Sequence, residues 1–137
     1  MTRRVYLGIV ESDLVEIVAS TTVPSARAFA VTVAERAAQP DEDEEDLEFE
    51  AMCAALDAAG ERRRTKGERR VVVSADVPSA EDSDAWSVVL PGVVALDDVV
   101  SFHVDEAAGT PVGEGYDGLL WYDVTELDEI VPADHQD

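Results

Sequence analysis

The chain has 137 residues, with 31 acidic and 10 basic side chains and a formal net charge of −21. This length corresponds to about one domain, and a hydrophobic content of 46% is enough to supply its core, so disorder of the whole chain is disfavoured. No apolar run approaches the ~20 residues that cross a bilayer, and Glu11 and Asp13 follow the first apolar stretch before a signal peptide could form. We therefore expect a cytoplasmic protein without membrane contact.

The single cysteine and the strong acidity restrict the partners further. Cys53 alone excludes an internal disulfide, which fits a reducing compartment. The negative field repels nucleic acid in general and attracts basic partners. Scarce lysine and abundant acid fit both adaptation to high salt and a GC-rich genome, and composition does not separate these two origins.

The first part of the chain predicts short elements. The β-branched and aromatic residues over 3–9 predict a strand, and Ser12 precedes apolar residues at helical spacing, which predicts a short helix over 13–19. Residues 27–33 predict a strand that passes into a helical turn over 34–38.

The longest helix is predicted over residues 44–63. Pro40 and the acids after it favour a helix start, because the helix dipole stabilises negative charge in the first turn. Leu47, Met52, Leu56 and Ala59 then recur at near-helical spacing.

The second half of the chain predicts mainly strands. Three consecutive valines within 69–74 are typical of a strand that is covered on both faces. The remaining predicted elements are strands over 86–90 and 99–104, a helical turn at 97–98, a flexible glycine-rich loop over 107–118, a buried strand over 119–124 and a capped helix over 125–131. We therefore expect one α/β domain over 1–131, a sandwich with a mixed sheet of five or six strands and one long helix, and a frayed tail over 132–137.

Six of the ten basic residues lie within nine consecutive positions, and no lysine or arginine follows them. One interpretation is a solvated loop that also stabilises the carboxyl end of the long helix. The other is a binding site for a protein or an anion, since guanidinium groups suit bidentate contacts with anions. The residues are Arg62, Arg63, Arg64, Lys66, Arg69 and Arg70.

His103 and Asp105 are the candidate catalytic or metal-binding residues. They lie two positions apart on a predicted strand, so their side chains should point to the same face. With Asp76 or Asp98, an imidazole and a carboxylate could bind zinc or transfer a proton. The simpler interpretation is a hydrogen-bonded histidine in the sheet, and His135 in the tail is expected to be merely exposed.

Several well-known sites are absent from the sequence. There is no phosphate-binding loop, zinc-binding histidine pair on a helix, or serine elbow. Gly113, Gly115 and Gly118 have the spacing of a dinucleotide fingerprint, but they do not link a strand to a helix. The acidic run from Asp41 lacks the glycine and the final glutamate of a calcium loop. Cys53 has no basic neighbour that would favour a thiolate. No cofactor is therefore expected.

Segments along nearly the whole chain resemble a family of small actinobacterial proteins that form a domain of unknown function. These segments are Arg4–Leu7, Ala28–Thr32, Leu47–Met52, Arg69–Pro78, His103–Asp105 and Leu119–Tyr122. The shared motifs are apolar and structural, so the resemblance implies one domain and carries over no active residue, cofactor or partner.

The sequence thus favours a non-enzymatic protein-binding or regulatory module, which acts on a protein partner or self-associates through a sheet edge or the long helix. Two alternatives stay open. One is a metal-binding or hydrolytic enzyme that uses His103 and nearby carboxylates, and the other is an acidic mimic of nucleic acid.

Overall fold

A computed structural model describes residues 2–132 of the chain, and its main feature is one large sheet. Seven strands pair in the order β5-β6-β3-β1-β4-β8-β9, and two more form a small separate sheet, β2-β7. The strands are β1 Arg3–Val10, β2 Thr22–Val23, β3 Ala28–Phe29, β4 Arg70–Val77, β5 Glu81–Asp82, β6 Ser87–Val89, β7 Val94–Ala95, β8 Val99–Val104 and β9 Leu120–Asp123.

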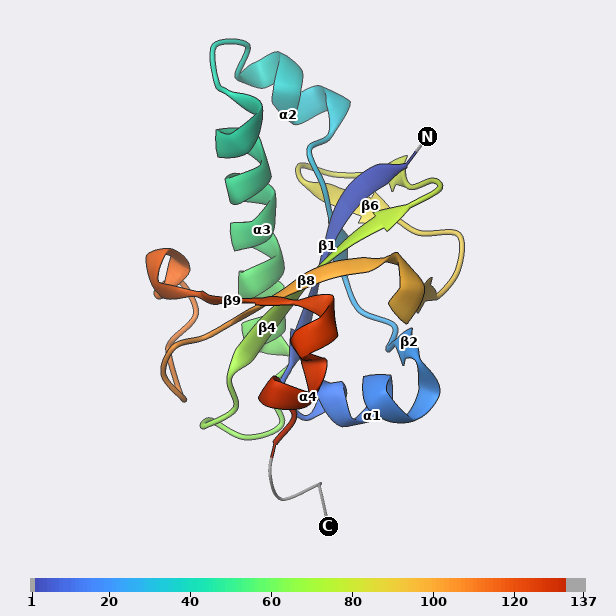
Figure 1. The fold of residues 1–137 in the computed structure, drawn as a ribbon. Coiled ribbons are helices and arrows are strands. Elements are labelled where there is room, and N and C mark those ends of the chain that lie inside the picture. Colours follow the sequence, from blue (N-terminus) through green and yellow to red (C-terminus); the bar gives the residue numbers. More distant parts are fainter. Residues whose placement is uncertain (1, 133–137) are drawn as a thin grey trace.

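The helices cover both faces of the large sheet. Figure 1 shows α3 to the left of the strands, and α1 and α4 close together at the bottom of the view. The helices are α1 Asp13–Ser20, α2 Val33–Ala38, α3 Glu44–Glu61 and α4 Leu127–Ile130, and short 3₁₀ turns are Leu96–Asp98, Tyr116–Gly118 and Val124–Glu126. In the part of the chain between residues 2 and 132, no helix is long and apolar enough to span a membrane.

Alternation along the central strands divides the core in two. Val71 and Val73 pack with Leu14 of α1 and Leu127 of α4, whereas Val72 packs against α3. The prediction that the valine strand is covered on both faces is therefore confirmed.

Helix α3 lies very close to β1 because of Gly8. A Cβ atom at this position would collide with the Ala55 carbonyl oxygen and lie 2.8 Å from the Ala59 nitrogen. Small residues dominate the buried side of the helix, including Ala51, Ala55 and Ala59. Close packing of the β1 backbone at Gly8 against the alanine-rich side of α3 thus fixes the position of the helix.

The predicted α/β sandwich is right in outline, and three details are wrong. Every strand pair in the described residues is antiparallel, so the sheet is not mixed. It has seven strands rather than five or six, because the two-residue strand β5 adds a further edge beside β6. The predicted strand over 27–33 shortens to β3, because Thr32 caps α2 by accepting a hydrogen bond from the Glu35 nitrogen at 3.2 Å.

The burial predicted for the strand over 119–124 is also wrong. The observed strand, β9, lies at the edge of the sheet, and its residues Leu120 and Trp121 are exposed. The helix after it begins at an Asp123–Glu126 capping box. Of the tail predicted over 132–137, residues 133–137 lie outside the described residues, as does His135.

Candidate functional site

The most buried member of the arginine cluster, Arg70, is 0% exposed and lies against Asp105. Its Nε and Nη2 donate to the two carboxylate oxygens at 2.8 and 2.9 Å, and its backbone nitrogen donates to the same side chain at 2.9 Å. Nη2 also donates to the Glu114 carbonyl at 2.6 Å. Arg70 therefore fastens the glycine-rich loop to the sheet.

Two further arginines converge on Asp13, which is buried at the start of α1. Arg62 Nε donates to Oδ2 at 2.7 Å, and Arg64 Nη2 donates to Oδ1 at 3.1 Å. Burial acts to raise the pKa of Asp13, but hydrogen bonds from Arg62 and from the Val10 nitrogen outweigh it and lower the pKa. These contacts join the carboxyl end of α3 to α1.

The remaining cluster residues have less buried contacts. Arg63 donates to the Glu68 carbonyl at 2.9 Å and to the Thr110 carbonyl, and Arg69 lies 4.0 Å from Glu11. Lys66 forms no ion pair in the described part of the chain. A protein or anion site at this cluster stays a prediction, and the ion pairs argue against it because a ligand would have to compete with them.

His103 and Asp105 are engaged with different partners. The Asp105 carboxylate binds Arg70 and lies 3.6 Å from Arg63, whereas His103 Nε2 lies 3.2 Å from Ser74 Oγ and 3.1 Å from Ser101 Oγ. Neither Asp76 nor Asp98 approaches His103 by a hydrogen bond or ion pair within residues 2–132.

Asp76 instead accepts two hydrogen bonds from Arg4, at 2.6 and 3.2 Å. No group of three or more histidine, cysteine, aspartate or glutamate side chains in residues 2–132 could hold a metal ion. The catalytic or metal-binding role of His103 and Asp105 stays an untested prediction.

A pocket of about 330 Å³ opens beside His103, on the α3 side of the sheet. Cross-strand register brings its floor together, since Tyr6 lies opposite Ser74, Ser74 opposite Ser101, and His103 opposite Trp121. Directly opposed residues share a face, so these side chains line one surface. We call this hollow the His103 pocket.

The wall of the His103 pocket comes from the first half of α3. Glu45, Glu48, Phe49 and Met52 line it, at the i, i+3, i+4 and i+7 positions that share one face of a helix. The Tyr6 hydroxyl donates to Glu48 at 3.3 Å and links floor to wall. Burial, followed by the nearby Glu48 charge, raises the pKa of Tyr6, so the phenol stays protonated.

The electrostatics of the His103 pocket are acidic at neutral pH. Burial, followed by the charge of Arg4, lowers the pKa of His103 to about 4, so its imidazole is neutral. Arg4 is the one cationic group of the lining, and it pairs with Asp76 at 2.6 Å. Glu45 and Glu48 remain as carboxylates without an ion-pair partner in the described residues.

Two aromatic side chains border the opening. Trp121 on β9 is 60% exposed and Phe49 on α3 is 39% exposed, although both line the pocket. Large exposed aromatic groups beside a hollow are typical of an interaction site, because an occupant can cover them.

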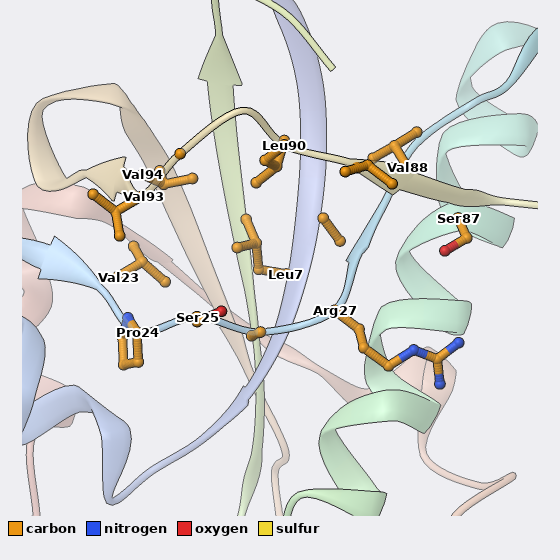
Figure 2. A pocket seen from close by; sticks show the side chains of 14 residues that line it. Leu7, Val23, Pro24, Ser25, Arg27, Ser87, Val88, Leu90, Val93 and Val94 are labelled. Atoms are coloured by element: carbon orange, nitrogen blue, oxygen red, sulfur yellow. The ribbon is translucent and has the colours of Figure 1, made fainter. Parts of the chain in front are cut away.

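A second and larger pocket, of about 470 Å³, lies on the opposite side of the sheet. It lies between the segment that follows β2, residues 24–28, and the segment that leads into β7, residues 87–93. Figure 2 shows Leu7, Val23, Leu90 and Val94 around the central space, with the guanidinium of Arg27 directed away from it. The aliphatic floor offers no charged group that would orient a ligand, so we regard the His103 pocket as the candidate site.

The sequence did not identify most of this site. Glu45, Glu48, Phe49 and Met52 do form a helical stripe, which was a usable signal. Nothing in the sequence, however, shows that this stripe faces β8 and β9, because their pairing is non-local. Trp121 was expected in a strand, and its exposure depends on β9 being an edge.

Cys53 is half-buried and follows Met52 of the pocket lining in sequence. Burial, followed by the charges of Asp57, Asp117 and Glu50, raises the pKa of its thiol to about 11. The thiol is therefore protonated at neutral pH.

The fold and the pocket define a small acidic α/β domain with a carboxylate-lined hollow beside its long helix. The chain belongs to DUF6912, a family of unknown function whose profile matches residues 3–131. This confirms the resemblance to a domain of unknown function. No curated protein and no solved structure matches the chain.

Proposed function

We propose that this domain is a non-enzymatic binding module that docks a basic protein partner. The main observation in support is that its positive charges are already paired within the chain. Each of the nine arginines forms an ion pair with a carboxylate of the same chain. Most other acidic side chains in residues 2–132 have no cationic partner, so the outer surface is left to attract a partner that brings positive charge.

The start of α3 is the most acidic part of this surface. Residues 41–46 are all acidic and all exposed, and they adjoin the His103 pocket through Glu45. Only Glu44 among them is paired, with Arg36. Acidic charge, a hollow and exposed aromatic groups therefore occur together at one end of α3.

Self-association is supported less well. Two copies would each bring a charge of −21 to the contact. The β9 edge is also short, and the Asp123 nitrogen donates to Glu126 at 2.9 Å instead of remaining free for another strand.

An enzymatic role for His103 is likewise supported less well. A histidine that activates a serine needs a group that orients its other ring nitrogen. In the described residues, no hydrogen bond to His103 Nδ1 occurs, and both hydroxyls share Nε2.

Binding of an octapeptide of alternating arginine and glycine, measured by calorimetry, tests the proposal. The triple variant Asp41→Asn, Glu42→Gln, Asp46→Asn should weaken binding about tenfold, whereas the matched variant Glu81→Gln, Asp84→Asn, Glu106→Gln should change it less than about twofold. Both variants remove three exposed acids.

No binding of this peptide by the unaltered protein in low salt would contradict the proposal. Equal weakening by the two triple variants would mean that charge acts over the whole surface, which would favour the acidic mimic of nucleic acid.

A further inference from the structure

We propose that the His103 pocket receives an arginine side chain of the basic partner. This inference rests on the proposed function and goes further, because it names the group that is bound and the residues that bind it. The pocket lies between strands β8 and β9 and the first half of α3, and its volume of about 330 Å³ is in the range that encloses a small ligand or a long side chain.

The charge of the lining selects a cation. Glu45 and Glu48 contribute negative charge, Arg4 is paired with Asp76, and His103 is uncharged at neutral pH. The lining therefore carries more negative than positive charge, with Glu45 and Glu48 against Arg4, partly shielded from water by the sheet and the helix. A cationic group that enters would restore neutrality.

The aromatic groups favour a planar cation. Trp121 and Phe49 border the same opening, and the face of an aromatic ring attracts a guanidinium placed over it. Trp121 is mostly exposed, so a stacked group can reach it without displacing protein atoms. Arginine combines the long stem and the flat head that such a site requires, whereas lysine has a compact and strongly hydrated ammonium.

Hydrogen-bond acceptors complete the match. A guanidinium has five N–H donors and no hydrogen-bond acceptor. The carboxylates of Glu45 and Glu48 stand one helical turn apart, and the hydroxyl oxygens of Ser74 and Ser101 line the floor. Glu48 uses one oxygen to accept from Tyr6, which holds this carboxylate in place.

The direct test compares two peptides that differ only in whether the central side chain ends in a charged guanidinium or a neutral urea group. Acetyl-Gly-Gly-Arg-Gly-Gly-amide should bind the 137-residue protein at least tenfold more tightly than the same peptide with citrulline, which has the shape of arginine but no charge. Calorimetry at low salt measures both affinities.

Three variants locate the binding. Glu45→Gln together with Glu48→Gln should weaken the arginine peptide about tenfold, and Trp121→Ala about fivefold. The matched control, Glu50→Gln with Glu81→Gln, removes two exposed acids that lie outside both the lining and residues 41–46. It should change the affinity less than about twofold.

The outcomes separate this inference from the proposed function. Equal affinity for the arginine and citrulline peptides would overturn the inference, as would equal effects of the pocket pair and its control. A further outcome is that the pocket variants have no effect on binding while the triple variant at residues 41–46 still weakens octapeptide binding more than its matched variant. In that case the pocket inference fails and the proposed function stands. If neither basic peptide binds, both proposals fail.

Discussion

Asp105 illustrates how a single residue can be misjudged from sequence. Its position two residues after His103 suggested a shared chemical role, yet its carboxylate holds the buried Arg70. Spacing along a strand predicts which face a side chain shares, but it does not show which opposite charge lies on the neighbouring strand. The arginines likewise clustered in sequence, and only the fold shows that they reach Asp13, Asp105 and Glu11.

Removing the Asp105 charge should destabilise the fold strongly. In Asp105→Asn, the guanidinium of Arg70 stays buried without its counterion, and breaking such a pair costs about 3–5 kcal/mol. Urea unfolding should show this loss, whereas Glu44→Gln at the exposed Arg36 pair should cost less than about 1 kcal/mol. A loss at Asp105 no larger than that at Glu44 would refute the structural role.

His103 should make stability depend on pH in a defined window. Because its folded pKa of about 4 lies below the ordinary value of 6.5, the unfolded chain binds the proton first as pH falls. The free energy of unfolding should therefore decrease between about pH 6.5 and 4, by roughly 1–3 kcal/mol. Paired carboxylates such as Asp76, whose pKa hydrogen bonds from Arg4 lower, lose their contribution only at more acidic pH.

The comparison that isolates this effect is His103→Asn. Its stability should fall less steeply than that of the unaltered protein between pH 6.5 and 4. Parallel curves over this range would show that the imidazole is accessible to protons in the folded state.

At the scale of elements, local patterns identified the long helix and the central strands. Helix α3 begins at the predicted residue and ends within two residues of the prediction, and β8 matches its predicted bounds. These segments carry strong periodicity or runs of β-branched residues. The two-residue strands β2 and β7 carry no such pattern, since they are defined only by their pairing with each other across a long stretch of chain.

The candidate site was harder to predict for the same reason. Its residues come from β1, β4, β8, β9 and α3, which are brought together by the sheet order and by the packing of α3 on β1. The sequence could supply the helical stripe of Glu45 and Glu48, but not the floor that it faces.

The contact between α3 and β1 predicts a severe effect at Gly8. In Gly8→Ala, the added methyl group would meet the backbone of Ala55 and Ala59, so the helix must move away from the strand. We expect a loss of about 2–3 kcal/mol in urea unfolding. Gly67→Ala, where the same methyl group meets nothing within 4 Å, is the control and should be nearly neutral. Similar stability of both variants would argue against this close packing.

For the whole molecule, the charge of −21 should set the response to salt. The ion pairs use a minority of the acids, so repulsion among the others opposes the compact state, and salt screens this repulsion. Raising sodium chloride from 20 to 500 mM should increase Tm by about 5 °C, equivalent to roughly 1 kcal/mol. A fall in Tm would mean that the internal ion pairs outweigh the repulsion.

We propose that positive charge enters the acidic surface at one defined point, the His103 pocket. The most direct measurement is a titration of the ¹⁵N-labelled protein with the arginine and citrulline pentapeptides, following the indole N–H of Trp121 by NMR. We expect the Trp121 signal to move to saturation with the arginine peptide and to stay nearly unchanged with citrulline, while the indole of Trp86 is unaffected. The same shifts with both peptides, or shifts confined to residues outside the pocket, would contradict it.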